Sequence, residues 1–120
     1  MKITSRQKEL IESEALAVSS LNIDGSPNLI AVAYAKVQYP NKIVITDNFM
    51  KRTPENIKRD SRICLAVWTK DWDEGYKFQG LAKYYSKGKY YELVKKLKEN
   101  EGYPAKGALV VLVNDITKLI

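Results

Sequence analysis

Histidine is absent from this sequence, and cysteine occurs only once, at Cys64. Without histidine, the chain lacks the commonest general base and the commonest metal ligand in proteins. A Ser-His-Asp triad is therefore excluded, and a zinc site of histidine and cysteine is strongly disfavoured. A single cysteine also excludes an internal disulfide. If the protein carries out chemistry, we expect a bound cofactor to supply it.

Long apolar stretches are missing too. No run approaches the ~18 residues that a transmembrane helix requires, and residues 1–14 are too polar for a signal peptide. We therefore expect a cytoplasmic protein without a membrane partner. The 120 residues suit one domain spanning residues 1–120, with an ordinary globular composition. The net charge of +6 favours an anionic partner, either a phosphorylated small molecule or a nucleic acid.

Apolar patterns separated by turn signals predict a chain made mostly of hairpins. A capping box at Thr4 and Gln7 predicts a first helix that ends near Ser13. Six strands and two further helices follow: strands at 15–22, 27–38, 42–46, 62–69, 76–85 and 107–115, helices at 53–60 and 86–100. Six strands in so short a chain favour a small, mostly antiparallel barrel with short flanking helices.

Three features of the predicted strands have a specific structural meaning. Cys64 lies in an apolar strand and is interpreted as a small buried hydrophobic residue. Gly80, inside another strand, indicates a bend or the close approach of a second backbone. Residues 107–115 are nearly all apolar, which predicts a strand buried on both faces, either in the core or under a partner subunit.

The segment before the second predicted helix suggests an anion site. Lys51 and Arg52 directly precede a helix start, Thr53-Pro54-Glu55, in which Thr53 can act as the cap. Cations beside the positive end of a helix are unfavourable unless an anion joins them, so this group predicts a phosphate site. The commoner alternative is a solvated basic corner in which Glu55 compensates the charge.

Together these motifs resemble the FMN-binding split-barrel family, the pyridoxamine 5'-phosphate oxidase-like proteins, and in particular its small single-domain members. The resemblance extends from about Leu10 to Leu119. It is carried by KIVITDN, by KRTxxNIxRDxRI, by a strand that ends in Trp68, and by GYxFxG. It makes the expected fold mainly β, a six-stranded antiparallel split β-barrel with short flanking helices. It also implies a homodimer, with residues 107–115 and 68–78 as candidate interface segments.

FMN is the cofactor that the resemblance implies. Arg52 and Thr53, with Lys51 close by, would hold its phosphate. The end of the third strand would run along the flavin, and the second strand would lie under the isoalloxazine ring, its backbone meeting the ring's polar edge. The implied cofactor-binding residues are Ile30, Ala31, Val32, Ala33, Ile45, Thr46, Asp47, Asn48, Lys51, Arg52 and Thr53. No catalytic residue and no metal ligand is assigned.

Three functions remain open at the level of sequence. The first two are an FMN-dependent oxidoreductase acting on an unknown small molecule and an FMN-binding electron carrier. The third, which we disfavour, is a basic barrel that binds nucleic acid through the tyrosines and lysines of residues 83–96. F420 or haem in place of FMN is a further alternative. The chain ends at Ile120, without the C-terminal substrate-binding segment of the full-length oxidases, so true pyridoxamine phosphate oxidase activity is not expected.

Aromatic residues have two possible places in this scheme. Tyr34, Trp68, Trp72 and Tyr76 either flank the isoalloxazine ring, from the same subunit or from a partner subunit, or pack at the barrel ends and the subunit interface.

Overall fold

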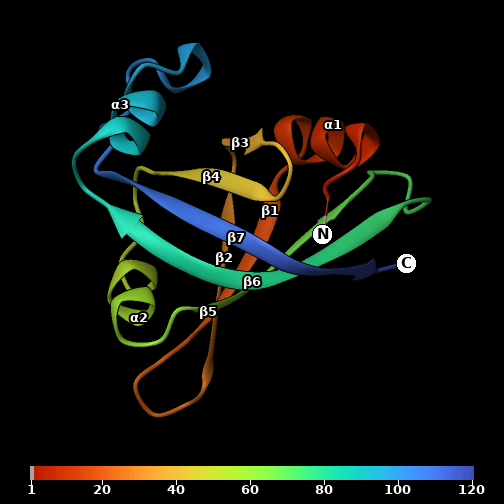
Figure 1. The fold of residues 1–120 in the computed structure, drawn as a ribbon, viewed down its shortest axis with the longest axis horizontal. Coiled ribbons are helices and arrows are strands. Elements are labelled where there is room, and N and C mark those ends of the chain that lie inside the picture. The colour runs from red at the N-terminus through yellow and green to blue at the C-terminus, as the bar shows by residue number, and fades with distance from the viewer. Residues whose placement is uncertain (1) are drawn as a thin grey trace.

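One strongly curved antiparallel sheet forms the body of the protein, and three short α-helices flank it (Figure 1). The computed structural model describes residues 2–120. The order of strands across the sheet is β2-β1-β5-β6-β7-β4-β3, and every neighbouring pair is antiparallel. The strands are β1 (Leu16–Leu21), β2 (Pro27–Val32), β3 (Ala35–Gln38), β4 (Lys42–Asp47), β5 (Arg62–Trp68), β6 (Gly75–Tyr85) and β7 (Gly107–Lys118). The helices are α1 (Ser5–Ser13), α2 (Thr53–Arg59) and α3 (Lys89–Lys95), followed by a 3-10 turn, η1 (Lys98–Asn100). The prediction of a mainly β fold with a curled antiparallel sheet is confirmed.

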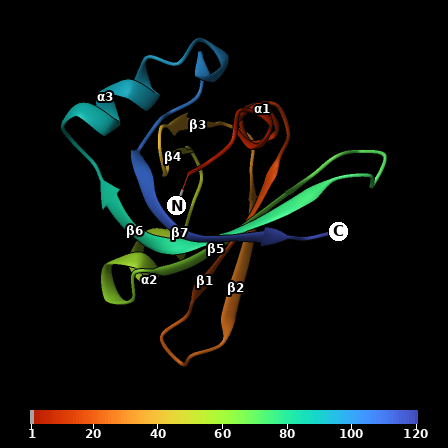
Figure 2. The same ribbon diagram turned by 45° about the vertical axis from the view of Figure 1, so that its right-hand side comes forward.

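The number of strands differs from the prediction, because the expected strand at residues 27–38 is divided in two. β2 pairs with β1 at one edge of the sheet, whereas β3 pairs with β4 at the opposite edge. Only Ala33 and Tyr34 lie between them. Two consecutive strands can occupy opposite edges of one sheet only if the sheet curls until its edges approach each other. Figure 2 shows this curl, with the β1–β2 hairpin crossing beneath β6 and β7.

The main core fills the concave side of the curled sheet. Strands contribute alternate residues to it, as in β1, where Leu16 and Val18 are buried and the intervening side chains are not. The largest fully buried side chain is Phe78 of β6. α1 covers this core with Leu10 and Ile11. The predicted capping box of α1 is present, since Thr4 and Gln7 each accept a hydrogen bond from the backbone N–H of the other.

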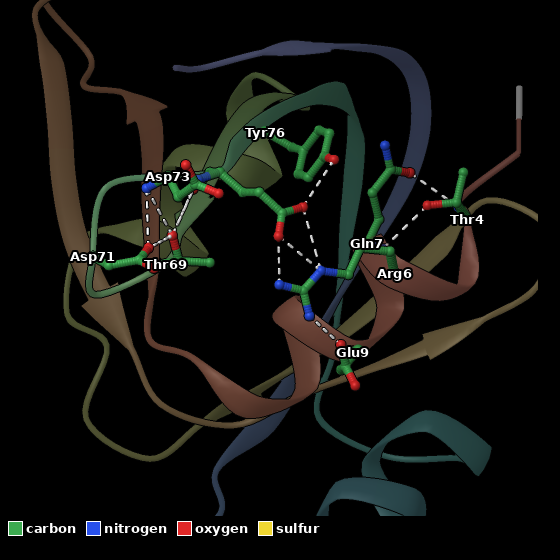
Figure 3. A network of polar contacts seen from close by, with 9 residues as sticks. Thr4, Arg6, Gln7, Glu9, Thr69, Asp71, Asp73 and Tyr76 are labelled. Carbon is green, nitrogen blue, oxygen red and sulfur yellow. Dashed lines mark hydrogen bonds and ion pairs between the residues drawn. The ribbon is translucent and has the colours of Figure 1, made fainter.

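A polar network ties α1 to the β5–β6 hairpin (Figure 3). The Arg6 guanidinium lies between the carboxylates of Glu9 and Glu74. The Tyr76 hydroxyl donates to the same Glu74 carboxylate at 3.3 Å. In the turn of the hairpin, Thr69 Oγ1 accepts from the backbone N–H groups of Asp73 and Glu74. Since these groups are largely exposed, the network orients the hairpin more than it stabilises the fold.

A second, smaller core explains why the last strand is apolar on both faces. Leu109 and Val111 point into the main core, whereas Ala108 and Val110 point to the other side of β7. There α3 covers them with Tyr90 and Val94. This part of β7 is therefore buried within the subunit. Further along, Leu112 is 46% exposed.

The helix expected at residues 86–100 is shorter than predicted. α3 begins only after Gly88, whose φ of 90° does not continue a right-handed helix, and it ends at Lys95. Leu97 is extended, with φ −62° and ψ 128°, and separates α3 from η1. The apolar stripe of this segment therefore packs onto β7 over about two turns, and the remainder forms a connection that leads back to the sheet.

None of the helices in residues 2–120 combines the length and the apolar character that crossing a membrane would require.

Gly80 lies where β6 and β7 change register. Gln79 is paired with Asp115 and Gly80 with Val113, so Asn114 bulges out of β7. A Cβ atom on Gly80 would lie 2.1 Å from the carbonyl oxygen of Leu112. The close backbone approach predicted from the sequence is therefore confirmed.

We predict that Gly80→Ala lowers the free energy of unfolding by about 1–3 kcal/mol, because the new methyl group forces the two strands apart. Urea denaturation of the variant measures this loss. Lys83→Ala, an exposed position on the same strand, is the matched control and should change stability by less than about 0.5 kcal/mol. Wild-type stability of Gly80→Ala would show that the β6–β7 register adjusts freely.

Candidate functional site

A pocket of about 550 Å³ lies between the edge strand β2 and the end of β4, which the curl of the sheet brings close together. One wall is the segment 28–34, which includes the corner between β2 and β3. The opposite wall is the segment 46–52, which is the end of β4 and the loop that leads to α2. Tyr103, from the connection between η1 and β7, completes the lining. The pocket therefore exists because the chain turns a corner between β2 and β3 instead of continuing as one strand.

Most of the residues that the sequence assigned to a cofactor line this pocket. Eight do so: Ile30, Ala31, Val32, Ala33, Thr46, Asn48, Lys51 and Arg52. The other three, Ile45, Asp47 and Thr53, are buried and do not line it. The structure thus brings the second-strand and third-strand candidates together. Ile45 instead packs in the core, and Asp47 and Thr53 lie behind the pocket wall and stabilise it through hydrogen bonds.

One end of the pocket is basic. Lys51 and Arg52 are both exposed there, and within residues 2–120 neither forms an ion pair. Glu55, the residue that could have compensated them, instead lies 3.8 Å from the ammonium group of Lys58. Two cations without a carboxylate partner at a pocket wall are suited to an anionic ligand group.

The expected role of Thr53 as the cap of α2 is wrong. The N-cap position is Arg52, which makes no capping hydrogen bond with its side chain, and Thr53 is the first residue of the helix. The Thr53 side chain is buried, and its hydroxyl accepts a hydrogen bond of 3.4 Å from the Asn28 amide. Thr53 therefore joins the start of α2 to β2 at the basic end of the pocket.

Thr46 lines the pocket and carries a buried hydroxyl with no partner within residues 2–120. Its side chain is 5% exposed, and within residues 2–120 its Oγ1 is buried without a hydrogen bond. The backbone N–H of Thr46 donates to the carbonyl oxygen of Tyr34 at 3.0 Å, which fixes the residue beside the β2–β3 corner. Buried polar atoms are almost always paired, so this hydroxyl indicates a place where a ligand or a water supplies the missing group.

The end of the pocket beside the β2–β3 corner, opposite the basic end, brings together aromatic side chains from three separate segments. The ring centroids of Tyr34 and Tyr103 are 6.2 Å apart, and those of Phe49 and Tyr103 are 6.1 Å apart. Sequence reasoning considered Tyr34 and missed Phe49 and Tyr103. No local pattern identifies Tyr103, because it reaches the pocket only through the path of the chain after α3. The pocket therefore has a basic end and an aromatic end.

Comparison with known proteins places the chain in a family. Residues 3–119 match the family described as pyridoxamine 5'-phosphate oxidase. The chain belongs to this family. Its fold is the small, single-domain split barrel that the sequence motifs resembled, so that assignment is confirmed.

Individual relatives match the chain along most of their length. The chain is 28% identical over 123 residues to an uncharacterized protein of Methanocaldococcus jannaschii, covering 99% of this chain and 82% of that protein. The crystal structure of HupZ from Group A Streptococcus is 26% identical, with a TM-score of 0.89 over 98% of this chain and 94% of HupZ. An FMN-binding protein from Syntrophomonas wolfei is similar in fold, with 16% identity and a TM-score of 0.74 over 94% of this chain and 83% of that protein.

Asp47 shapes the pocket wall of this family member without touching the pocket. Its carboxylate is fully buried and accepts hydrogen bonds from the backbone N–H of Met50 at 2.8 Å and the hydroxyl of Tyr84 at 2.6 Å. The Lys106 ammonium lies 3.9 Å from the carboxylate and donates to the carbonyl oxygen of Met50 at 2.7 Å. These contacts fix the loop that carries Asn48, Lys51 and the other pocket residues of segment 46–52.

The Tyr84 hydroxyl donates a hydrogen bond to the Asp47 carboxylate. Burial and the hydrogen bond to Asp47 both raise the pKa of Tyr84, so its hydroxyl stays protonated at neutral pH. Tyr84 thereby satisfies a charge that would otherwise be buried with fewer partners.

Cys64 lies away from the pocket. It is half-buried rather than fully buried, on the convex face of the sheet between Ser19 of β1 and Gln79 of β6. Burial raises the pKa of its thiol, and Lys77 opposes the shift. Within residues 2–120 no group of three His, Cys, Asp or Glu residues is placed to hold a metal ion.

We predict that Tyr84→Phe lowers the free energy of unfolding by about 1–3 kcal/mol, because the buried Asp47 carboxylate loses one of its donors. Chemical denaturation measures the loss. Tyr85→Phe is the matched control, since its hydroxyl has no side-chain hydrogen bond among residues 2–120. Equal stability of the two variants would show that Asp47 does not depend on Tyr84.

Proposed function

We propose that the protein is a homodimeric flavoprotein that binds FMN in the pocket between β2 and the segment 46–52. The observation that carries the proposal is the pocket's two-ended character in a member of this family. FMN has a phosphate dianion at one end and a flat, largely apolar ring with a polar edge at the other. The pocket offers unpaired cations at one end and aromatic side chains with a free hydroxyl at the other.

The basic end suits the phosphate. Lys51 and Arg52 are exposed and unpaired within residues 2–120, and the amide of Asn28 stands beside them through its bond to Thr53. An arginine can hold two phosphate oxygens at once, which gives direction as well as attraction. Asn28 to Val32 spans about 13 Å of extended strand, so a ligand that reaches from this end along β2 must be elongated.

β2 suits the ring because it is an edge strand. Within residues 2–120 it pairs with β1 alone, so one side of its backbone has N–H and C=O groups without a strand partner. Ala31 and Ala33 are small and exposed, which lets a flat ring approach this backbone closely. Thr46 Oγ1, on the opposite wall, supplies a further hydrogen-bonding group.

Electron or hydride transfer would be the work of the flavin, which is consistent with a chain that has no histidine. The residues of the chain would then bind the phosphate, orient the ring and limit the access of water to it. This division of labour fits both an oxidoreductase with a small-molecule substrate and an electron carrier. Oxidation of NADH or NADPH in the presence of quinone acceptors separates the two, since turnover supports the enzyme and its absence supports the carrier.

The nucleic-acid alternative is weakened by where the tyrosines of residues 83–96 lie. Tyr90 is buried beneath β7 and its hydroxyl is 3.1 Å from the Lys42 ammonium. Tyr84 is half-buried and bound to Asp47. Neither presents an open ring on which a base could stack.

We predict that Arg52→Ala weakens FMN binding by about 1.5–3 kcal/mol, because the phosphate loses a charge-assisted contact. Titration followed by flavin fluorescence measures the affinity. Riboflavin, which lacks the phosphate, should bind the variant and the wild type alike. Lys87→Ala removes one positive charge from an exposed position outside the pocket and should leave both affinities unchanged.

The absorption spectrum of the purified wild-type protein tests the cofactor first. Flavin bands or tight FMN binding support the proposal. A colourless protein that does not bind FMN contradicts it, and titrations with F420, haem and oligonucleotides then distinguish the alternatives. Wild-type FMN affinity in Arg52→Ala would mean that the phosphate lies elsewhere.

The convex face of the sheet supports the homodimer. Leu81 and Leu112 are neighbours across β6 and β7 and are 47% and 46% exposed. Leu29, on the same face, is 70% exposed, and the half-buried Cys64 and Ala66 lie between it and β6. On this curved face the leucines and the small residues between them, with the exposed Arg62 and Lys83 beside Leu81, are suited to an isologous contact with a second copy.

We predict that the double variant Leu81→Glu with Leu112→Glu shifts the protein from dimer to monomer at micromolar concentration, because four carboxylates would be buried in each dimer. Sedimentation velocity measures the change in mass. Ile23→Glu, an 85% exposed residue at the tip of the β1–β2 hairpin, is the control and should remain dimeric. A wild-type protein that sediments as a monomer contradicts the homodimer.

A further inference from the structure

Tyr103 reaches the pocket from a connection that is fixed at both of its ends. Before it, Asn100 is 3% exposed and exchanges two amide hydrogen bonds with Asn48, at 2.6 and 3.1 Å. After it, the backbone N–H of Lys106 donates to the carbonyl oxygen of Asp47 at 2.8 Å, and its ammonium donates to Met50. All three partners belong to the pocket wall at segment 46–52. Residues 100–106 therefore form a strap across this wall.

Within the strap, the backbone holds Tyr103 in place. Its N–H donates to the carbonyl oxygen of Asn100 at 3.1 Å. Gly102 turns the chain at a φ of 87°, which other residues adopt poorly. Pro104 follows and restricts Tyr103 to an extended backbone. The position of this one side chain is thus determined by the strap as a whole.

The ring of Tyr103 is incompletely covered by its neighbours. Tyr34 is tilted by 53° to it and Phe49 by 82°, so neither lies flat against it. Tyr103 keeps 48% of its surface exposed and Phe49 keeps 66%. Aromatic rings held apart in this way can bury further surface against a flat ligand ring.

Thr46 is the polar group at the same end of the pocket. Its unpaired Oγ1 lies on the residue whose backbone binds Tyr34. A ligand ring that stacks on aromatic side chains and offers a hydrogen-bonding atom at its edge would satisfy both the open rings and this hydroxyl. A planar heteroaromatic ring is therefore the ligand part that suits this end of the pocket.

We propose that Tyr103 stacks on the planar ring of the pocket's ligand, with Phe49 closing the same end, and that Asn100 positions Tyr103 through its bond to Asn48. This assignment rests on the proposed function, with the isoalloxazine as the ring. It makes the strap at residues 100–106 part of the binding site, although no other residue of that strap lines the pocket.

The test is a titration of FMN and of riboflavin into wild type, Tyr103→Ala, Tyr103→Phe and Tyr39→Ala. Tyr103→Ala should weaken both ligands by the same factor, about tenfold, because each loses the stacking contact. Tyr103→Phe keeps the ring and should stay within about threefold of wild type. Tyr39, 51% exposed and outside the pocket, is the matched control and should have no effect.

Flavin emission provides a second readout that a general loss of stability would not mimic. A stacked tyrosine quenches the flavin, so bound riboflavin at saturation should be brighter in Tyr103→Ala than in Tyr103→Phe. Wild-type affinity and emission for both ligands in Tyr103→Ala would overturn the assignment. Weakening of FMN alone would also overturn it, because that result places Tyr103 at the phosphate.

Asn100→Ala tests the positioning role. It should weaken riboflavin by a factor close to that of Tyr103→Ala, and the double variant should be no weaker than either single one. Additive losses would show that Asn100 does not act through Tyr103.

Failure of the flavin proposal is distinguishable from failure of this one. If the wild type binds neither FMN nor riboflavin, the proposed function is wrong, and the same variants are titrated with haem as another planar ligand. A loss of haem binding in Tyr103→Ala, restored in Tyr103→Phe, then supports the ring site. Unchanged haem binding, or no binding of haem by the wild type, overturns it.

Discussion

The short connection between β2 and β3 is the constraint on which the rest of the structure depends. These strands pair at opposite edges of a seven-strand sheet, and only two residues join them. A flat sheet of that width cannot be bridged by two residues, so the sheet must curl until its edges approach. The curl gives the core its concave side, which α1 then covers. It also leaves β2 with an unpaired edge facing the end of β4. The pocket is the space that remains where the edges approach without joining.

Around this opening the chain uses buried polar contacts to hold its loops in place. Asp47 binds Met50 and Tyr84, and Asn48 binds Asn100, so one short segment after β4 anchors both the loop before α2 and the strap before β7. The Asp47 side chain lies behind the pocket wall, whereas Asn48 itself lines the pocket. Among the lining side chains, Asn28 and Asn48 are hydrogen-bonded, but the Thr46 hydroxyl and the charges of Lys51 and Arg52 are unpaired within residues 2–120. Unpaired groups on a well-bonded support are expected of a site that binds a ligand.

The parts of the fold that depend on local pattern were predictable from the sequence. The capping box of α1, the alternation along the strands and the close approach at Gly80 each follow from residues near one another in the chain. The division of residues 27–38 into two strands was not predictable, because the apolar pattern of a segment does not indicate which other strands it pairs with. Eight of the eleven candidate residues that the family resemblance implied line one pocket, whereas neither local pattern nor the resemblance indicated Tyr103. Its contribution depends on Asn100 and Lys106 finding partners more than fifty positions earlier in the chain.

The absence of histidine becomes informative once the pocket is in view. A site that moved protons with its own side chains would bring titratable groups to the reacting centre. Here the charged side chains of the pocket lining, Lys51 and Arg52, lie at its basic end, and Asp47 is turned away into the support. The aromatic end offers rings, hydroxyl groups and free backbone groups, which bind and orient a ligand. Such an arrangement makes chemical sense if the reactive group arrives with the ligand, so that the protein's task is to hold a planar ring in a fixed place.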